Sequence, residues 1–266
     1  MKPHVICHMM VSLDGRIHPS RWTASPDGNR QDWTTIYEGV HGTLAGDAWL
    51  VGRVTMAEMS KGTPHPPSRP EKVERPHHFA KRDAGTYAIA FDRSGKLHFA
   101  KADIGGDHVV VLLGPGVSDV HLAELAGDGI SYVVAPHEAM APRPLFELLG
   151  RELGIKRLLV EGGGNVNGSL LAAGVVDELS LLVAPAIDGA LGVSGVFEVP
   201  DAKGLAGKVQ LRFVASEALA HGWCTCATRW KRAKAATRPH DRRRDMPPGC
   251  SSLPAFLDSP ACARSS

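Results

Sequence analysis

The sequence predicts an α/β fold in which a mostly parallel central sheet is flanked by helices and ends in a C-terminal antiparallel strand pair. Three observations support this prediction. Short apolar runs of strand length recur along the chain. Segments with helical start and stop signals separate most of these runs, and such crossovers join parallel strands. The last two runs, residues 209–216 and 223–230, have no helix between them and are predicted to pair antiparallel.

The N-terminal elements follow from their boundaries. Residues 4–11 form an apolar run that predicts a buried strand, and an Asp-Gly turn at residues 12–15 ends it. A helix is expected from Asp32 or Thr34, either of which can act as the N-cap, to about residue 44. The next elements are a strand over residues 48–51 and a helix that begins near Arg53.

Residues 62–76 contain five prolines, so regular secondary structure is excluded there. We expect a long loop that lies over the surface, and long loops of this kind often cover functional sites.

Beyond the loop, apolar runs again predict strands, and the segments between them predict helices. The expected strands are residues 87–92, 96–99, 108–113, 131–135, 157–160 and 177–184. The expected helices are residues 119–126, 144–153 and 166–173.

Composition restricts the class of protein. The chain has 266 residues, 43% of them hydrophobic and 22% charged, as in ordinary globular domains. It has no apolar stretch near the ~18 residues that span a bilayer and no signal-peptide core, so we expect a cytoplasmic protein. The five cysteines form no C-x-x-C unit. We therefore expect neither a disulfide framework nor a metal site.

Charge divides the chain in two. Residues 231–266 hold eight Lys or Arg against three Asp, and they include five prolines. The remaining residues 1–230 carry about −3. We expect a folded domain over residues 1–230 and a basic, proline-rich disordered tail over 231–266, because the tail has too few apolar residues to offset its ordering entropy. We assign no nucleic-acid-binding role to the tail.

The most informative segment is residues 158–171, LLVEGGGNVNGSLL. An apolar strand ends in Glu161, passes through Gly162, Gly163 and Gly164, and restarts as a helix. Backbone N–H groups and the positive end of a helix dipole can meet a phosphate at such a turn. Alternatively, the glycines only let the chain turn between strand and helix. The segment is neither a P-loop nor the dinucleotide fingerprint.

Three candidate residues fall at predicted strand ends: Asp14, Gly52 and Glu161. In open α/β sheets, ligands bind beyond the carboxyl ends of the strands. We therefore expect these residues to share one site.

Together, several motifs resemble the C-terminal reductase domain of the riboflavin-biosynthesis deaminase/reductase, which has a dihydrofolate-reductase-like fold. They are S-L-D-G-R at residues 12–16, V-G-R-V-T at 51–55, V-E-G-G-G-N at 160–165 with G-S-L at 168–170, V-D-E-L at 176–179, and Ala184-Pro185. The resemblance covers residue 4 to about residue 230. The deaminase half is missing, because no H-x-E followed by P-C-x-x-C occurs.

The resemblance implies NADPH-dependent hydride transfer to a pyrimidine ribosylamine phosphate or a pterin-like molecule. By motif, Gly52, Arg53 and Thr55 would hold cofactor phosphate or ribose. The pyrophosphate would contact a second set: Gly162, Gly163, Gly164, Asn165 and Gly168. A guanidinium such as that of Arg53 favours NADPH over NADH, because the 2′-phosphate needs a cationic partner.

Two carboxylates, Asp14 and Glu161, are the candidate catalytic residues. Either can bind the amino groups of the substrate or donate the proton that accompanies hydride addition. The structural alternatives are a turn residue for Asp14 and a helix-start carboxylate for Glu161. Trp33 is a third substrate-binding candidate, because it could stack on cofactor or substrate; it could equally pack as a hydrophobic staple.

Three features depart from the family pattern. His8 stands where the riboflavin reductases usually have Lys, Met59 stands where they commonly have Asp, and the proline-rich loop replaces their D-P-x-L-T-x-R segment, whose Arg supports the substrate phosphate. Met59 and the missing segment leave open a different class of function, a non-catalytic NADP(H)-binding or scaffold protein of the same fold. By resemblance alone, we also expect a homodimer.

Overall fold

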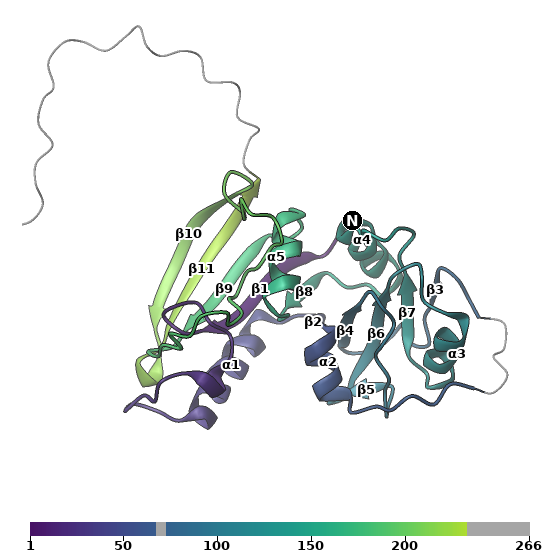
Figure 1. Cartoon of the computed structure of the whole chain (residues 1–266), viewed down its shortest axis with the longest axis horizontal. Helices are drawn as coiled ribbons and strands as arrows, with labels where there is room; N and C mark the ends of the chain where they lie inside the picture. The colour runs from purple at the N-terminus through teal and green to yellow at the C-terminus, as the bar shows by residue number, and fades with distance from the viewer. Residues whose placement is uncertain (68–72, 233–266) are drawn as a thin grey trace, which may run out of the picture. The chain divides into compact units, whose positions relative to one another are not determined.

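The computed structural model describes residues 1–67 and 73–232 (Figure 1). The predicted disordered tail over residues 231–266 is wrong at its first two residues, because Lys231 and Arg232 end the last strand, Cys224–Arg232, and pair with Gln210 and Val209. The rest of that prediction, residues 233–266, lies outside the described residues, as do residues 68–72 of the proline-rich loop. The described residues of that loop on the N-terminal side, 62–67, form no helix or strand, as predicted.

The described residues form one eleven-stranded sheet with the order β10-β11-β9-β1-β8-β2-β4-β6-β7-β3, and β5 pairs with β6 (Figure 1). All pairs from β9 to β7 are parallel, as predicted. The strands are β1 His4–Val11, β2 Ala48–Gly52, β3 His77–His78, β4 Tyr87–Asp92, β5 Asp103–Ile104, β6 Asp107–Leu113, β7 Ser131–Val134, β8 Arg157–Val160, β9 Glu178–Val183, β10 Val209–Ala218 and β11 Cys224–Arg232.

Helices cover both faces of this sheet. They are α1 Arg30–Leu44, α2 Arg53–Ser60, α3 Asp119–Gly127, α4 Pro142–Glu152 and α5 Gly164–Ala172, with short 3₁₀ turns at Pro19–Arg21 and Ala220–Gly222. Successive strand residues point to opposite faces, so Leu50 packs in the core under α4 and α5, whereas Trp49 and Val51 pack in the core under α2 and α3. None of the described helices combines the length and apolarity needed to cross a membrane.

The closing strands β10 and β11 pair antiparallel, and β11 also pairs antiparallel with β9. The predicted C-terminal antiparallel pair is therefore confirmed. It forms one edge of the sheet, where β10 has a free side (Figure 1).

One predicted strand is wrong. Residues 96–99 form an irregular segment, although Leu97 and Phe99 alternate with polar residues and are buried. The carboxylate of buried Asp92 accepts hydrogen bonds from the backbone N–H groups of Lys96 (2.6 Å) and Leu97 (2.8 Å). These bonds occupy donors that a strand would give to a neighbouring strand.

The start of α1 also differs from the prediction. Its N-cap is Asn29, whose side chain accepts from the N–H groups of Gln31 and Asp32, while the Asp32 carboxylate accepts from the N–H of Asn29. Asp32 thus belongs to the capping box at the third helical position and is not itself the cap.

The sheet order brings the candidate residues to one place. β1 pairs with β8, and β8 pairs with β2, all in parallel. The carboxyl ends of β8 and β2 therefore lie side by side, followed by Glu161 and Arg53, whereas β1 runs on past its last pair with β8, Cys7 with Val160, and ends at Val11.

Candidate active site

A cleft of about 630 Å³ opens at the carboxyl ends of β1, β8 and β2. Its lining includes Gly52, Arg53 and Thr55 at the start of α2, and every residue from Glu161 to Asn165. The structure thus brings together most of the residues that the sequence predicted to bind cofactor.

Two helix N-termini meet at this cleft. The N-cap residues are Gly52 for α2 and Gly163 for α5, both with extended backbone, and neither helix has a side-chain cap. The first N–H groups of both helices are therefore available to an external acceptor. Their dipoles place partial positive charge on the same space, which favours an anion such as a phosphate.

Arg53 adds a full positive charge to this end of the cleft. Its side chain is exposed, and it makes no ion pair with any carboxylate in the described part of the chain. The guanidinium can therefore bind a phosphate without first breaking a salt bridge.

Glycine is favoured at different positions of this segment for different physical reasons. A Cβ on Gly164 would lie 2.2 Å from the carbonyl oxygen of Gly195, and one on Gly168 would lie 2.0 Å from that of Glu198. Both residues therefore allow the segment around residues 195–198 to approach α5. Gly168 does not line the cleft. A Cβ on Gly163 would meet nothing within 4 Å, so this residue leaves space at the cleft.

Glu161 has a partner that the sequence did not indicate. The Nδ1–H of His41, in the last turn of α1, donates to Glu161 Oε1 over 2.7 Å. This hydrogen bond raises the pKa of His41. Tyr37 lies one helical turn earlier on the same helix, and burial together with the Glu161 carboxylate raises its pKa well above the usual value.

His8 lies beside this group within the sheet. It is fully buried and stacks on Tyr37, with ring centroids 4.6 Å apart. Its Nδ1 is 3.2 Å from Ser180 Oγ on β9. Burial lowers the pKa of His8, so the neutral form of its imidazole is favoured.

The structure separates the two carboxylates that the sequence left equivalent. Asp14 does not line the cleft. Its oxygens accept from the Ser12 hydroxyl (2.5 Å) and from the N–H groups of Asp188 (3.1 Å) and Gly189 (2.9 Å). These hydrogen bonds, the one from Ser12 foremost, lower the pKa of Asp14 to about 2. Asp14 therefore holds the loop after β9 as a stable anion.

Trp33 also lies away from the cleft lining. It is 4% exposed and packs with Trp22 and Trp223, at ring-centroid distances of 5.7 and 5.9 Å. This aromatic cluster joins α1 to the start of β11 and is part of the hydrophobic core.

The model of the RibD C-terminal domain family matches residues 3–225, which is most of the chain and extends from the start of β1 to the first residues of β11. The chain belongs to the RibD C-terminal domain family. It is also 27% identical, over 206 residues, to the 2,5-diamino-6-ribosylamino-4(3H)-pyrimidinone 5′-phosphate reductase of Methanothermobacter thermautotrophicus. That match covers 71% of this chain and 81% of the relative. The family and this relative support a reductase function.

Solved structures share the fold. A pyrimidine reductase-like protein from Corynebacterium diphtheriae matches with a TM-score of 0.60 at 20% identity, over 86% of this chain and 92% of its own. The riboflavin biosynthesis reductase Rib7 of Saccharomyces cerevisiae matches with a TM-score of 0.52 at 19% identity, over 86% and 90%. The α/β fold predicted for this RibD C-terminal domain is confirmed.

Proposed function

We propose that the protein is an NADPH-dependent reductase that transfers hydride to a pyrimidine ribosylamine phosphate or a pterin-like small molecule. The observation that carries the proposal is the pair of uncapped helix N-termini, of α2 and α5, that line one cleft together with Arg53. This arrangement suits a dinucleotide, which presents several phosphates close together.

In this proposal the residues fit the cofactor as follows. The first N–H groups of α5, from Gly164 onward, bind the pyrophosphate, and those of α2 bind a second phosphate or ribose. Arg53 pairs with the 2′-phosphate, which selects NADPH over NADH. When bound, NADPH supplies the hydride, and the protein supplies geometry and charge.

Glu161 is the proposed substrate-facing carboxylate. It lines the cleft next to the proposed pyrophosphate site, and it can accept hydrogen bonds from the amino groups of a diaminopyrimidine or pterin. His41 holds a proton at Nδ1, 2.7 Å from the Glu161 carboxylate, so the pair can deliver a proton to the reduced substrate. The name of the archaeal relative supports a phosphorylated pyrimidine as the substrate class.

The test combines binding and turnover. Titrating the protein into NADPH should change nicotinamide fluorescence, and adding ribosylaminopyrimidine phosphates or dihydropterins should oxidise the cofactor. Glu161→Gln should retain NADPH affinity and lose turnover, because the substituted amide neither holds nor relays a proton. Absence of NADPH binding at millimolar cofactor would refute the proposal. Binding without turnover of any tested pyrimidine or pterin would favour the non-catalytic alternative.

A further inference from the structure

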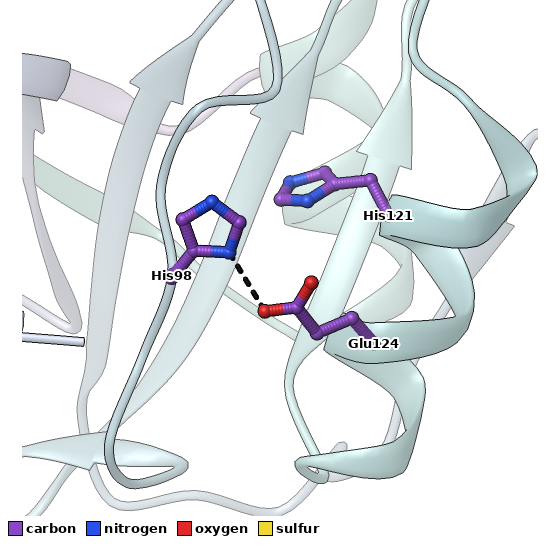
Figure 2. Close-up of side chains that lie close together, drawn as sticks. All are labelled: His98, His121 and Glu124. Atoms are coloured by element: carbon purple, nitrogen blue, oxygen red, sulfur yellow. Dashed lines mark hydrogen bonds and ion pairs between the residues drawn. The ribbon is translucent and has the colours of Figure 1, made fainter. Parts of the chain in front are cut away.

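Two imidazoles and a carboxylate meet at a second place, on the α3 side of the sheet (Figure 2). His98 lies on the irregular segment after β4, and His121 and Glu124 lie three residues apart on one face of α3. One possible ligand atom from each residue lies within 4.8 Å of the other two. None of the three lines the cleft described above.

Two of the three residues are buried, and one of their ring nitrogens has no hydrogen-bond partner among the described residues. His121 is 7% exposed and Glu124 is 3% exposed. His98 Nδ1 contacts Glu124 Oε1 over 2.7 Å, whereas His121 Nε2 is buried without a hydrogen-bond partner in the described part of the chain. A buried polar atom without a partner costs about 1–3 kcal/mol. Figure 2 shows the His121 ring projecting from α3 toward His98, above the Glu124 carboxylate.

We propose that His98, His121 and Glu124 bind a divalent transition-metal ion of the zinc type. Zinc takes imidazole nitrogen and carboxylate oxygen at about 2.0–2.2 Å, commonly from three protein ligands with one further position. Ligands at that radius in a tetrahedron lie about 3.4 Å apart. Small side-chain rotations bring atoms now within 4.8 Å of one another to that spacing.

A residue outside the proposed ligand set, His65, contacts the Glu124 carboxylate. The backbone N–H of His65 donates to Glu124 Oε1 (3.1 Å), and the His65 ring contacts Asp128 Oδ1 through Nε2 (2.9 Å). Partners of this kind orient ligands around metal sites.

The proposed ion would connect three segments of the chain: the segment after β4, α3 and α2. The carbonyl of His98 accepts from the Ser60 hydroxyl at the end of α2 (3.1 Å). A metal at this site therefore ties the segment after β4 to α3 and, through His98, to α2. The ion would lie outside the cleft described above, so its effect on the protein would come through these linked segments.

The experiment uses the full chain without a histidine tag, stripped with a chelator. Calorimetric titration with Zn²⁺ should give one site per chain, and Co²⁺ should give the visible d–d absorption of a tetrahedral site. His98→Gln, His121→Gln and Glu124→Gln should each weaken Zn²⁺ binding by roughly a hundredfold or more, since even loss of an outer partner costs ~10- to 100-fold. The exposed His137→Gln is the matched control and should bind as the wild type.

Two results would overturn the proposal: a wild-type protein that takes up no Zn²⁺, or ligand variants that bind Zn²⁺ like the control. Circular dichroism establishes that each variant is folded. If the buried His121→Gln fails to fold, His98→Gln still decides the question, because His98 is partly exposed and lies on an irregular segment.

Discussion

At the scale of single residues, position decides which of two carboxylates can take part in chemistry. Asp14 accepts three hydrogen bonds and remains an anion, and its oxygens serve the loop after β9. Glu161 faces the cleft and has a titratable partner, His41. In the function proposed above, the Glu161–His41 pair is therefore the place where a proton would be held and released.

The pair makes a prediction about pH. Because Glu161 raises the pKa of His41 in the folded protein, the stabilisation is fully present below the unfolded value of about 6.5 and is lost as the pH rises through the folded value. In Glu161→Gln, the NMR titration midpoint of His41 should move to lower pH. The midpoint of His108, whose pKa burial and Lys81 lower, should not move. An unchanged His41 midpoint would mean that the pair does not form.

Arg53 gives a prediction about cofactor choice. Arg53→Met should weaken NADPH binding by roughly ten- to a hundredfold, since a hydrogen bond to a charged group is worth about 1.5–3 kcal/mol. NADH binding should change less, because that cofactor has no 2′-phosphate. Fluorescence titration with both cofactors measures the difference.

The matched control for this experiment is Lys61→Met, at the opposite end of α2. It should leave both affinities unchanged. Equal losses of NADPH and NADH affinity in Arg53→Met would place the guanidinium at a phosphate that both cofactors share.

At the scale of elements, the sequence predicts the strands and helices that a local hydrophobic pattern marks. Long apolar runs located the buried strands, and residues 87–92 were predicted with the observed bounds. The two-residue strands β3 and β5 were missed because two residues hold no periodicity. Residues 96–99 were wrongly predicted as a strand because their alternate side chains are buried, as in a strand. In the structure they belong to a loop that hydrogen bonds to the Asp92 carboxylate hold in place.

Some residues of the candidate site could likewise be predicted from local sequence, and others could not. The motif glycines, Arg53 and Glu161 come directly after predicted strands, so their place at the strand ends of the cleft could be predicted. His41 could not, because it reaches Glu161 across 120 residues of sequence. The His98 and His121 pairing depends equally on how α3 packs against the segment after β4. Cysteine spacing, on which the expectation of no metal site was based, contains no information about such a group.

The glycines of α5 provide a prediction about stability. Gly168→Ala should lower the free energy of unfolding by about 1–3 kcal/mol, because its Cβ would overlap the backbone carbonyl of Glu198. Gly163→Ala should stay within ~0.5 kcal/mol of the wild type, because its backbone is extended and the space is open. Urea denaturation distinguishes the two. If the two variants had equal free energies of unfolding, the segment around Glu198 would be able to move away from the added Cβ without loss of stability.

At the scale of the whole molecule, the free edge of the sheet suggests self-association. β10 is exposed along nearly its whole length and carries Leu211, Phe213 and Val214, which are 51%, 63% and 45% exposed. An apolar edge strand of this kind invites pairing with another chain.

We therefore predict a homodimer that buries β10. Phe213→Asp should convert the dimer to monomer in size-exclusion chromatography with light scattering, because it places a charge in the apolar interface. Leu191→Asp is the control, since Leu191 is 97% exposed but lies outside β10. A wild-type protein that stays monomeric at high micromolar concentration would contradict this prediction.

The position of β1 in the sheet constrains how the chain is made. β1 is synthesised before both strands beside it, β8 and β9, which begin only at Arg157 and Glu178. Until then the apolar residues of β1 have no neighbouring strand to pair with. These residues are therefore exposed to aggregation until β8 and β9 have been synthesised, and the central part of the sheet can assemble only after that point.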